Sequence, residues 1–173
     1  MTALKKGFTL IELLIVIAIL GVLAVVVLVA INPAQQLART RDAGRISSVA
    51  QIGHALEAFA TVHAGAYPTT VEWNADVLVT SGELNNLPGL VQNTLTSTCT
   101  TQAIDGWCYS VAASPAGFAV YSRLEADTNL TLGGGTCNGT NPAFVVYSSA
   151  NGRACIICQA GEPTAGAPGT CAN

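Results

Sequence analysis

Hydrophobic and polar residues follow three successive patterns along the chain. Residues 8–31 read FTLIELLIVIAILGVLAVVVLVAI, an apolar run in which Glu12 is the one charge. A helix of this length spans about 36 Å at 1.5 Å per residue, and the hydrocarbon core of a bilayer is about 30 Å thick. The first pattern therefore predicts a helix that can cross a membrane.

The second pattern is amphipathic. Between residues 33 and 63, apolar residues recur at spacings of three and four, at Ile46, Val49, Ile52, Leu56 and Phe59. This periodicity predicts a long stem helix with one apolar face, which another element has to cover. The Gly65 and Pro68 that follow predict its end, because glycine favours a helix stop and proline cannot continue the helix.

The third pattern is typical of strands. β-branched and aromatic residues concentrate in four segments, 107–113, 118–124, 143–149 and 154–159. Turn residues separate these segments, with Ser114-Pro115-Ala116-Gly117 and Asn151-Gly152 as predicted hairpin connections. A short helix is expected over 75–81. Together the patterns predict an α+β fold, in which the long N-terminal helix packs on a roughly four-stranded, mostly antiparallel sheet.

Charge and cysteine content restrict the compartment and the partners. Lys5 and Lys6 precede the apolar run and favour a cytoplasmic start, which places the rest of the chain outside. Beyond residue 63 there are two arginines and seven acidic residues, a net charge of −5, so no nucleic-acid partner is predicted for this part. Six cysteines, all beyond residue 98, favour disulfides in an oxidising compartment over reduced metal-binding thiols.

A carboxylate inside an apolar run needs a compensating partner. Glu12 would cost about 2.5–3.5 kcal/mol at the centre of a membrane-spanning helix, and less towards the end. Residues 5–24, KKGFTLIELLIVIAILGVLA, resemble the N-terminus of type IV prepilins and related pseudopilins. The resemblance implies that a prepilin peptidase cleaves between Gly7 and Phe8 and that the new Phe8 amine is methylated. It also implies that Glu12 pairs with this ammonium on a neighbouring subunit.

The same resemblance suggests a division of the chain. Residues 1–7 would be a leader peptide, 8–31 a transmembrane and polymerisation helix, 32–63 an amphipathic stem helix, and 64–173 an extracytoplasmic head. Helix-breaking positions are expected at Gly21, Asn32 and Pro33. Many pilins have a proline at the position of Val29, and Asn32-Pro33 is expected to serve instead, as an N-cap and first-turn proline.

Disulfide pairing is the least determined feature, because six cysteines allow fifteen full pairings. A turn at Asp105-Gly106 favours a Cys99–Cys108 bridge. If residues 154–159 form a strand, Cys155 and Cys158 point to opposite faces and cannot easily bond to each other or share a metal. We therefore expect Cys137–Cys155 and Cys158–Cys171, the latter fixing the tail as a C-terminal disulfide does in many pilins.

Three arginines of the stem, Arg39, Arg41 and Arg45, are predicted on its polar surface, in water or paired with lipid phosphates or with acids of neighbouring subunits. Asp105, Glu125 and Asp127 could contribute to a calcium site of the kind found in some secretion pseudopilins, although no spaced acidic motif demands one. The sequence shows no Ser/His/Asp set, phosphate loop or metal-ligand cluster. We therefore predict no catalytic residue, no metal and no cofactor.

Three functions agree with these sequence features. The first is a structural subunit of a type IV pilus, a helical homopolymer supporting adhesion, motility or DNA uptake. It would lie in the cytoplasmic membrane before assembly, then in an extracellular fibre, with the prepilin peptidase and N-methyltransferase, an assembly platform and an ATPase as partners. The second is a pseudopilin of a type II secretion system in a periplasmic fibre. The third is a membrane-anchored thiol oxidoreductase that uses Cys155 and Cys158.

Overall fold

The chain consists of two units, which are described separately. The computed structural model divides it into Met1–Leu37 and Ala38–Asn173. It describes residues 7–89, 103–104, 106–112, 117–132, 137–138 and 140–171.

The first unit is dominated by the apolar helix α1, Leu10–Ile31, which has 22 residues, none of them buried. Within the part of the chain that the structure describes, α1 is the one helix long and apolar enough to cross a membrane. The next helix, α2, runs from Pro33 to Val62. Asn32 separates the two in the left-handed conformation, with φ 46°.

The second unit contains a five-stranded antiparallel sheet in the order β1-β2-β3-β4-β5. The four predicted strands are confirmed, and a two-residue strand, β1, precedes them. The expected helix over 75–81 is shorter, at α4, and α3 and α5 were not predicted. The remaining elements are α3 Thr70–Asn74, α4 Val77–Thr80, β1 Ala103–Ile104, β2 Trp107–Val111, β3 Phe118–Arg123, α5 Asn129–Leu132, β4 Ala143–Ser148 and β5 Ala154–Cys158.

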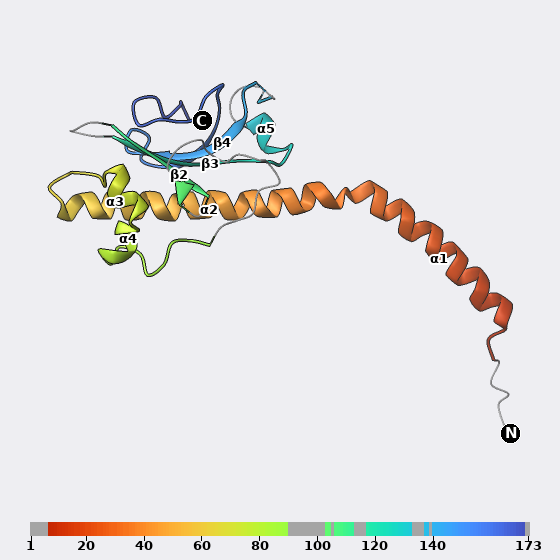
Figure 1. Ribbon diagram of the computed structural model, residues 1–173. Coiled ribbons are helices and arrows are strands. Elements are labelled where there is room, and N and C mark those ends of the chain that lie inside the picture. Colours follow the sequence, from red (N-terminus) through yellow and green to blue (C-terminus); the bar gives the residue numbers. More distant parts are fainter. Residues whose placement is uncertain are drawn as a thin grey trace. The chain divides into compact units, whose positions relative to one another are not determined.

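Both faces of the sheet are covered. Figure 1 shows the sheet lying along α2, whose buried apolar face packs on the inner face of the sheet. This cluster includes Val49, Ile52, Leu56 and Phe59 of the predicted stripe, together with Tyr109, Phe118, Val120, Val145 and Tyr147. A smaller cluster on the outer face contains Cys108, Ala119, Tyr121, Phe144, Val146 and Ile157. The amphipathic pattern of α2 is thus explained by a sheet that covers it.

One described turn shows why the chain reverses between β4 and β5. Of the predicted hairpins, Asn151-Gly152 is confirmed, since both backbone N–H groups donate to the Ser148 carbonyl at 3.1 and 2.9 Å, and Gly152 has φ 62°. Positive φ is accessible to glycine without steric cost. The other predicted turn, at Ser114, Pro115 and Ala116, lies outside the described residues.

At Gly53, α2 lies close against the sheet. A Cβ at this position would collide with the ring of Tyr147 on β4, a side chain that is 2% exposed. Because aromatic rings in a packed core have little room to move, the absence of a side chain at Gly53 sets the helix-to-sheet distance.

We expect Gly53→Ala to lower the free energy of unfolding of the head by about 1–3 kcal/mol, the usual cost of overpacking a core. Chemical denaturation of the full chain in detergent, followed by near-UV circular dichroism, measures this. Gly166→Ala is the matched control, because a Cβ there meets no atom within 4 Å. Equal stabilities of the two variants would contradict the close-packing account.

Candidate processing and assembly site

The first turn of α1 holds Glu12 in a reciprocal capping arrangement with Thr9. The Thr9 backbone N–H and hydroxyl donate to Glu12 Oε2 at 2.8 and 2.7 Å, and the Glu12 N–H donates to Thr9 Oγ1 at 3.3 Å. This capping box satisfies donors that a helix start otherwise leaves free. The other oxygen, Glu12 Oε1, has no hydrogen-bond partner among the residues described.

Gly7 and Phe8 lie ahead of the first helical residue. Neither is in regular secondary structure, and Phe8 is 86% exposed. A Cβ built on Gly7 meets no atom within 4 Å. The peptide bond between them is therefore accessible to a peptidase without prior unfolding of α1, as a cleavage site requires.

The three predicted helix-breaking positions behave differently. The interruption lies at Asn32, where the backbone carbonyl and side-chain Oδ1 both accept from the Gln35 N–H, at 3.1 and 3.4 Å, so Asn32 caps the helix that begins at Pro33. Gly21, by contrast, lies inside α1 without interrupting it. The expectation of a break there is wrong, because one glycine costs a helix only about 1 kcal/mol relative to alanine.

A buried polar network joins α2 to the segment after β3. Asp42 is 1% exposed and accepts hydrogen bonds from the backbone N–H groups of Glu125 and Ala126, from Asn129 Nδ2 and from Arg45. The Asn129 bond, from Nδ2 to Asp42 Oδ2, measures 2.6 Å. One carboxylate thus holds two residues of the connection between β3 and α5, together with the first residue of α5.

Two arginines complete the network around Glu125. Arg41 binds both of its carboxylate oxygens, at 2.7 and 3.2 Å, and Arg45 Nη2 binds Oε1 at 2.8 Å. The hydrogen bond to Glu125 raises the pKa of Arg41 above its usual value. The expected surface position is therefore wrong for Arg45, whose side chain is 1% exposed. Arg41 keeps 30% of its side chain exposed, but its acidic partner is Glu125 of the same chain and not a neighbouring subunit. Arg39 is exposed as predicted.

The disulfides differ from the expected pairing. Cys137 bonds to Cys158, and Cys155 bonds to Cys171, in place of Cys137–Cys155 and Cys158–Cys171. Cys155 and Cys158 do point to opposite faces of β5, as predicted, since Cys158 packs with the inner cluster and Cys155 with the outer one. The tail is therefore joined to the outer face.

The remaining cysteines are only partly described. Cys108 is disulfide-bonded, and Cys99, its expected partner, lies outside the described residues. No bond joins Cys155 to Cys158, so the redox interpretation loses the internal bridge that a Cys-x-x-Cys motif would provide.

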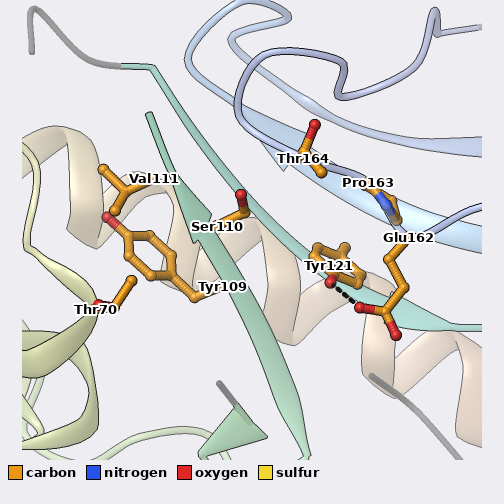
Figure 2. Close-up of a pocket in the computed structure, with 8 residues that line it drawn as sticks. All are labelled: Thr70, Tyr109, Ser110, Val111, Tyr121, Glu162, Pro163 and Thr164. Carbon is orange, nitrogen blue, oxygen red and sulfur yellow. Dashed lines mark hydrogen bonds between the residues drawn. The ribbon is translucent and has the colours of Figure 1, made fainter. Parts of the chain in front are cut away.

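A pocket of about 150 Å³ lies on the head between β2, β3, the start of α3 and the C-terminal segment (Figure 2). The Tyr121 hydroxyl donates to Glu162 at 2.9 Å, and Ser110 Oγ accepts from the Ala165 N–H at 3.2 Å. Burial and this bond to Glu162 raise the pKa of Tyr121, which keeps the phenol neutral. These polar groups hold the C-terminal segment against the sheet.

The suggested calcium ligands do not converge in the described residues. Glu125 is bound by Arg41 and Arg45, and Asp105 lies outside the described residues. Among described residues, no group of three or more His, Cys, Asp or Glu side chains could hold a metal ion.

One comparison with known families agrees with these features of the N-terminus, which are the apolar α1, the exposed Gly7–Phe8 peptide bond and the capped Glu12. A family profile described as the prokaryotic N-terminal methylation motif matches residues 3–28. The match covers 26 of the 173 residues and supports a likeness to type IV pilins and prepilins. No curated protein and no solved structure matches the chain.

Several properties of this prepilin-like chain follow at a coarse level. The motif indicates a structural protein rather than an enzyme, a membrane-anchored precursor, peptidase processing and assembly into a filament. The α+β fold with a long N-terminal helix, an antiparallel sheet and disulfides fits a pilin. Thr9 and Asp42 were missed from sequence, although the Thr-x-x-Glu spacing of Thr9 and Glu12 is a readable capping signature.

We expect the chain isolated from its native cells to begin at Phe8 and to carry one additional methyl group on its amine. N-terminal sequencing with intact-mass measurement checks this. Gly7→Val should block cleavage, because a branched side chain would occupy the scissile position, whereas Gly21→Ala should be processed normally. A chain that still begins at Met1, in cells with an active prepilin peptidase, would contradict the processing assignment.

Asp42→Ala should lower the free energy of unfolding of residues 38–173 by about 3–5 kcal/mol, because it leaves two backbone N–H groups without their acceptor and takes from the buried Arg45 one of its two carboxylate partners. Denaturation of the full chain in detergent measures the change. Arg39→Ala, on the exposed side of the same helix, should stay within about 0.5 kcal/mol of the unmodified chain. A small effect of Asp42→Ala would show that the network contributes little to stability.

Proposed function

We propose that the chain is a structural subunit of a type IV pilus that polymerises through α1 after cleavage between Gly7 and Phe8. The observation that carries this proposal is the exposure of α1, because all 22 of its residues are exposed. Helix surfaces as apolar as this one do not remain in water. Lipid covers α1 before assembly, and the α1 helices of other subunits cover it in the fibre.

The route into the fibre begins in the membrane. Lys5 and Lys6 keep the leader in the cytoplasm, where the peptidase and N-methyltransferase act on Gly7 and Phe8. The platform protein and the ATPase then move the subunit out of the bilayer. The head, on the far side of the membrane, becomes the outer surface of the fibre and is available for adhesion, motility or DNA uptake.

Glu12 provides the register for this polymerisation. Thr9 and Glu12 both follow the cleavage site, so the capping box persists in the mature chain. Because Thr9 occupies Oε2, the oxygen Oε1 remains available to the methylated ammonium of Phe8 on a neighbouring subunit. A carboxylate in an apolar surrounding is costly without a cation, so arrangements that supply this ammonium are favoured over other lateral contacts.

A pseudopilin of a type II secretion system uses the same N-terminal chemistry and is the second candidate. The disulfide-bonded head favours the pilus, because two described bridges and the bonded Cys108 stabilise a small domain exposed outside the cell. Shearing intact cells and locating the chain distinguishes the two. Recovery in long surface filaments supports the pilus, and recovery only in the periplasm supports the pseudopilus.

We expect Glu12→Gln to be cleaved normally but to enter sheared filaments roughly a hundredfold less than the unmodified chain. The physical reason is loss of the charge pair, and breaking a buried pair costs about 3–5 kcal/mol. Quantitative immunoblotting of sheared filaments against whole cells measures incorporation.

Glu72→Gln is the matched control for this variant. Thr69 and Glu72 form a second capping box at the start of α3, with the same three hydrogen bonds, outside the apolar helix. Its loss should leave incorporation unchanged. Assembly of Glu12→Gln at the normal level would rule out the proposed role of the carboxylate.

A further inference from the structure

The two described disulfides interleave along the chain. Cys137 bonds to Cys158, and Cys155 bonds to Cys171, so each bridge closes a segment that contains one end of the other. Consecutive pairing would instead join Cys137 to Cys155 and Cys158 to Cys171. The native connectivity therefore depends on distinguishing two cysteines that are only three residues apart.

That distinction is made by the two faces of β5. Cys158 lies beside Cys137 at a Cα–Cα distance of 5.1 Å and packs with the cluster between the sheet and α2. Cys155 lies 5.5 Å from Cys171 by the same measure and packs with the outer cluster. Only a strand already in its native register presents each cysteine to its proper partner.

The sequence of β5 does not by itself select this register. The strand contains Cys155-Ile156-Ile157-Cys158, which reads the same in both directions. In the native register, Ile156 and Cys158 face inward while Cys155 and Ile157 face outward. A shift by one residue exchanges the two faces. Each face would again hold one isoleucine and one cysteine, so hydrophobic burial separates the two registers poorly.

Chain entropy also fails to favour the native bridges. They close sequence separations of 21 and 16 residues, whereas consecutive bridges would close 18 (155 minus 137) and 13 (171 minus 158). By loop-closure entropy the shorter loops are favoured, though only by roughly 1.7-fold overall. Cys155 also leaves the membrane before Cys158, and so meets Cys137 first. The consecutive pairing is thus a competitive product of oxidation.

We propose that this chain is a substrate of a thiol–disulfide exchange catalyst, a protein with a reactive dithiol that converts consecutive bridges into the native interleaved ones. The catalyst thiolate attacks Cys137 Sγ, breaking the Cys137–Cys155 bond and releasing Cys155 as a thiolate. Cys155 then attacks Cys171 and releases Cys158, and Cys158 attacks Cys137 and releases the catalyst. The number of disulfides is unchanged, so these three exchange steps need no oxidant or reductant.

The test is oxidative refolding of the reduced, denatured full chain in detergent micelles. One sample is oxidised with diamide alone. A second sample is oxidised with diamide in the same way and is then given a mixture of reduced and oxidised glutathione, with or without a catalytic amount of protein disulfide isomerase. Thiols are blocked with N-ethylmaleimide, and thermolysin, which cleaves before isoleucine, separates Cys155 from Cys158. Mass spectrometry then reads the pairing.

Diamide alone should leave at least half of the chains with Cys137–Cys155 or Cys158–Cys171 bridges. Glutathione should convert these to the native pairing over minutes to hours, the range of uncatalysed rearrangement, and the isomerase should accelerate this at least tenfold. Native pairing in nearly all chains with diamide alone would overturn the proposal, as would an unchanged rate with the isomerase.

A variant with both Cys155→Ser and Cys171→Ser provides the matched control. It retains the native Cys137–Cys158 bridge but removes the interleaving, so diamide alone should form this bridge in nearly all chains. If the variant depends on glutathione as strongly as the unmodified chain, interleaving is not the cause and the proposal fails. If the variant does not fold, the pairing measured in the unmodified chain still tests the proposal.

Discussion

The need to cover α1 is the constraint on which the rest of the molecule depends. All 22 of its residues are exposed in the isolated chain, and their surface is apolar apart from one carboxylate. Nothing this apolar is stable in water, so the helix requires lipid or other protein at every stage. The accessible bond before Phe8 and the capping box at Glu12 both lie at the start of this helix, whose covering partners come from outside the chain.

In the second unit, Ala38–Asn173, the apolar face of α2 is covered within the chain. One face of this helix is covered by a sheet from the same chain, and Gly53 lets the two approach closely at Tyr147. Near the start of the head, apolar packing gives way to the network of Asp42, Arg45 and Glu125. Buried charges of this kind are costly unless fully paired. Here Asp42 also satisfies backbone N–H groups, which fixes the path of the chain after β3.

Local patterns in the sequence predicted the two long helices and the four longer strands, because periodicity and turn residues act over a few positions; the short helices α3 and α5 were missed. They missed β1, whose two residues are too few for a pattern. They also placed Arg45 on the surface, because its partner Glu125 is 80 positions away and no local signal marks the pair. The disulfides were mispaired for a related reason, since Cys155 and Cys158 differ only in the face of β5 that each occupies. The motif around Phe8 was recognisable because its chemistry is contained within a few residues.

The proposed pilus assembly requires that the Glu12 carboxylate meets the Phe8 ammonium of a neighbouring subunit in the fibre. Electron cryo-microscopy of filaments isolated from cells, at a resolution that shows side chains, tests it most directly. We expect α1 helices bundled in the fibre core, with Glu12 Oε1 at about 3 Å from a neighbour's Phe8 nitrogen, a usual length for a charge-assisted hydrogen bond. Filaments in which Glu12 contacts only its own Thr9, or solvent, would contradict it.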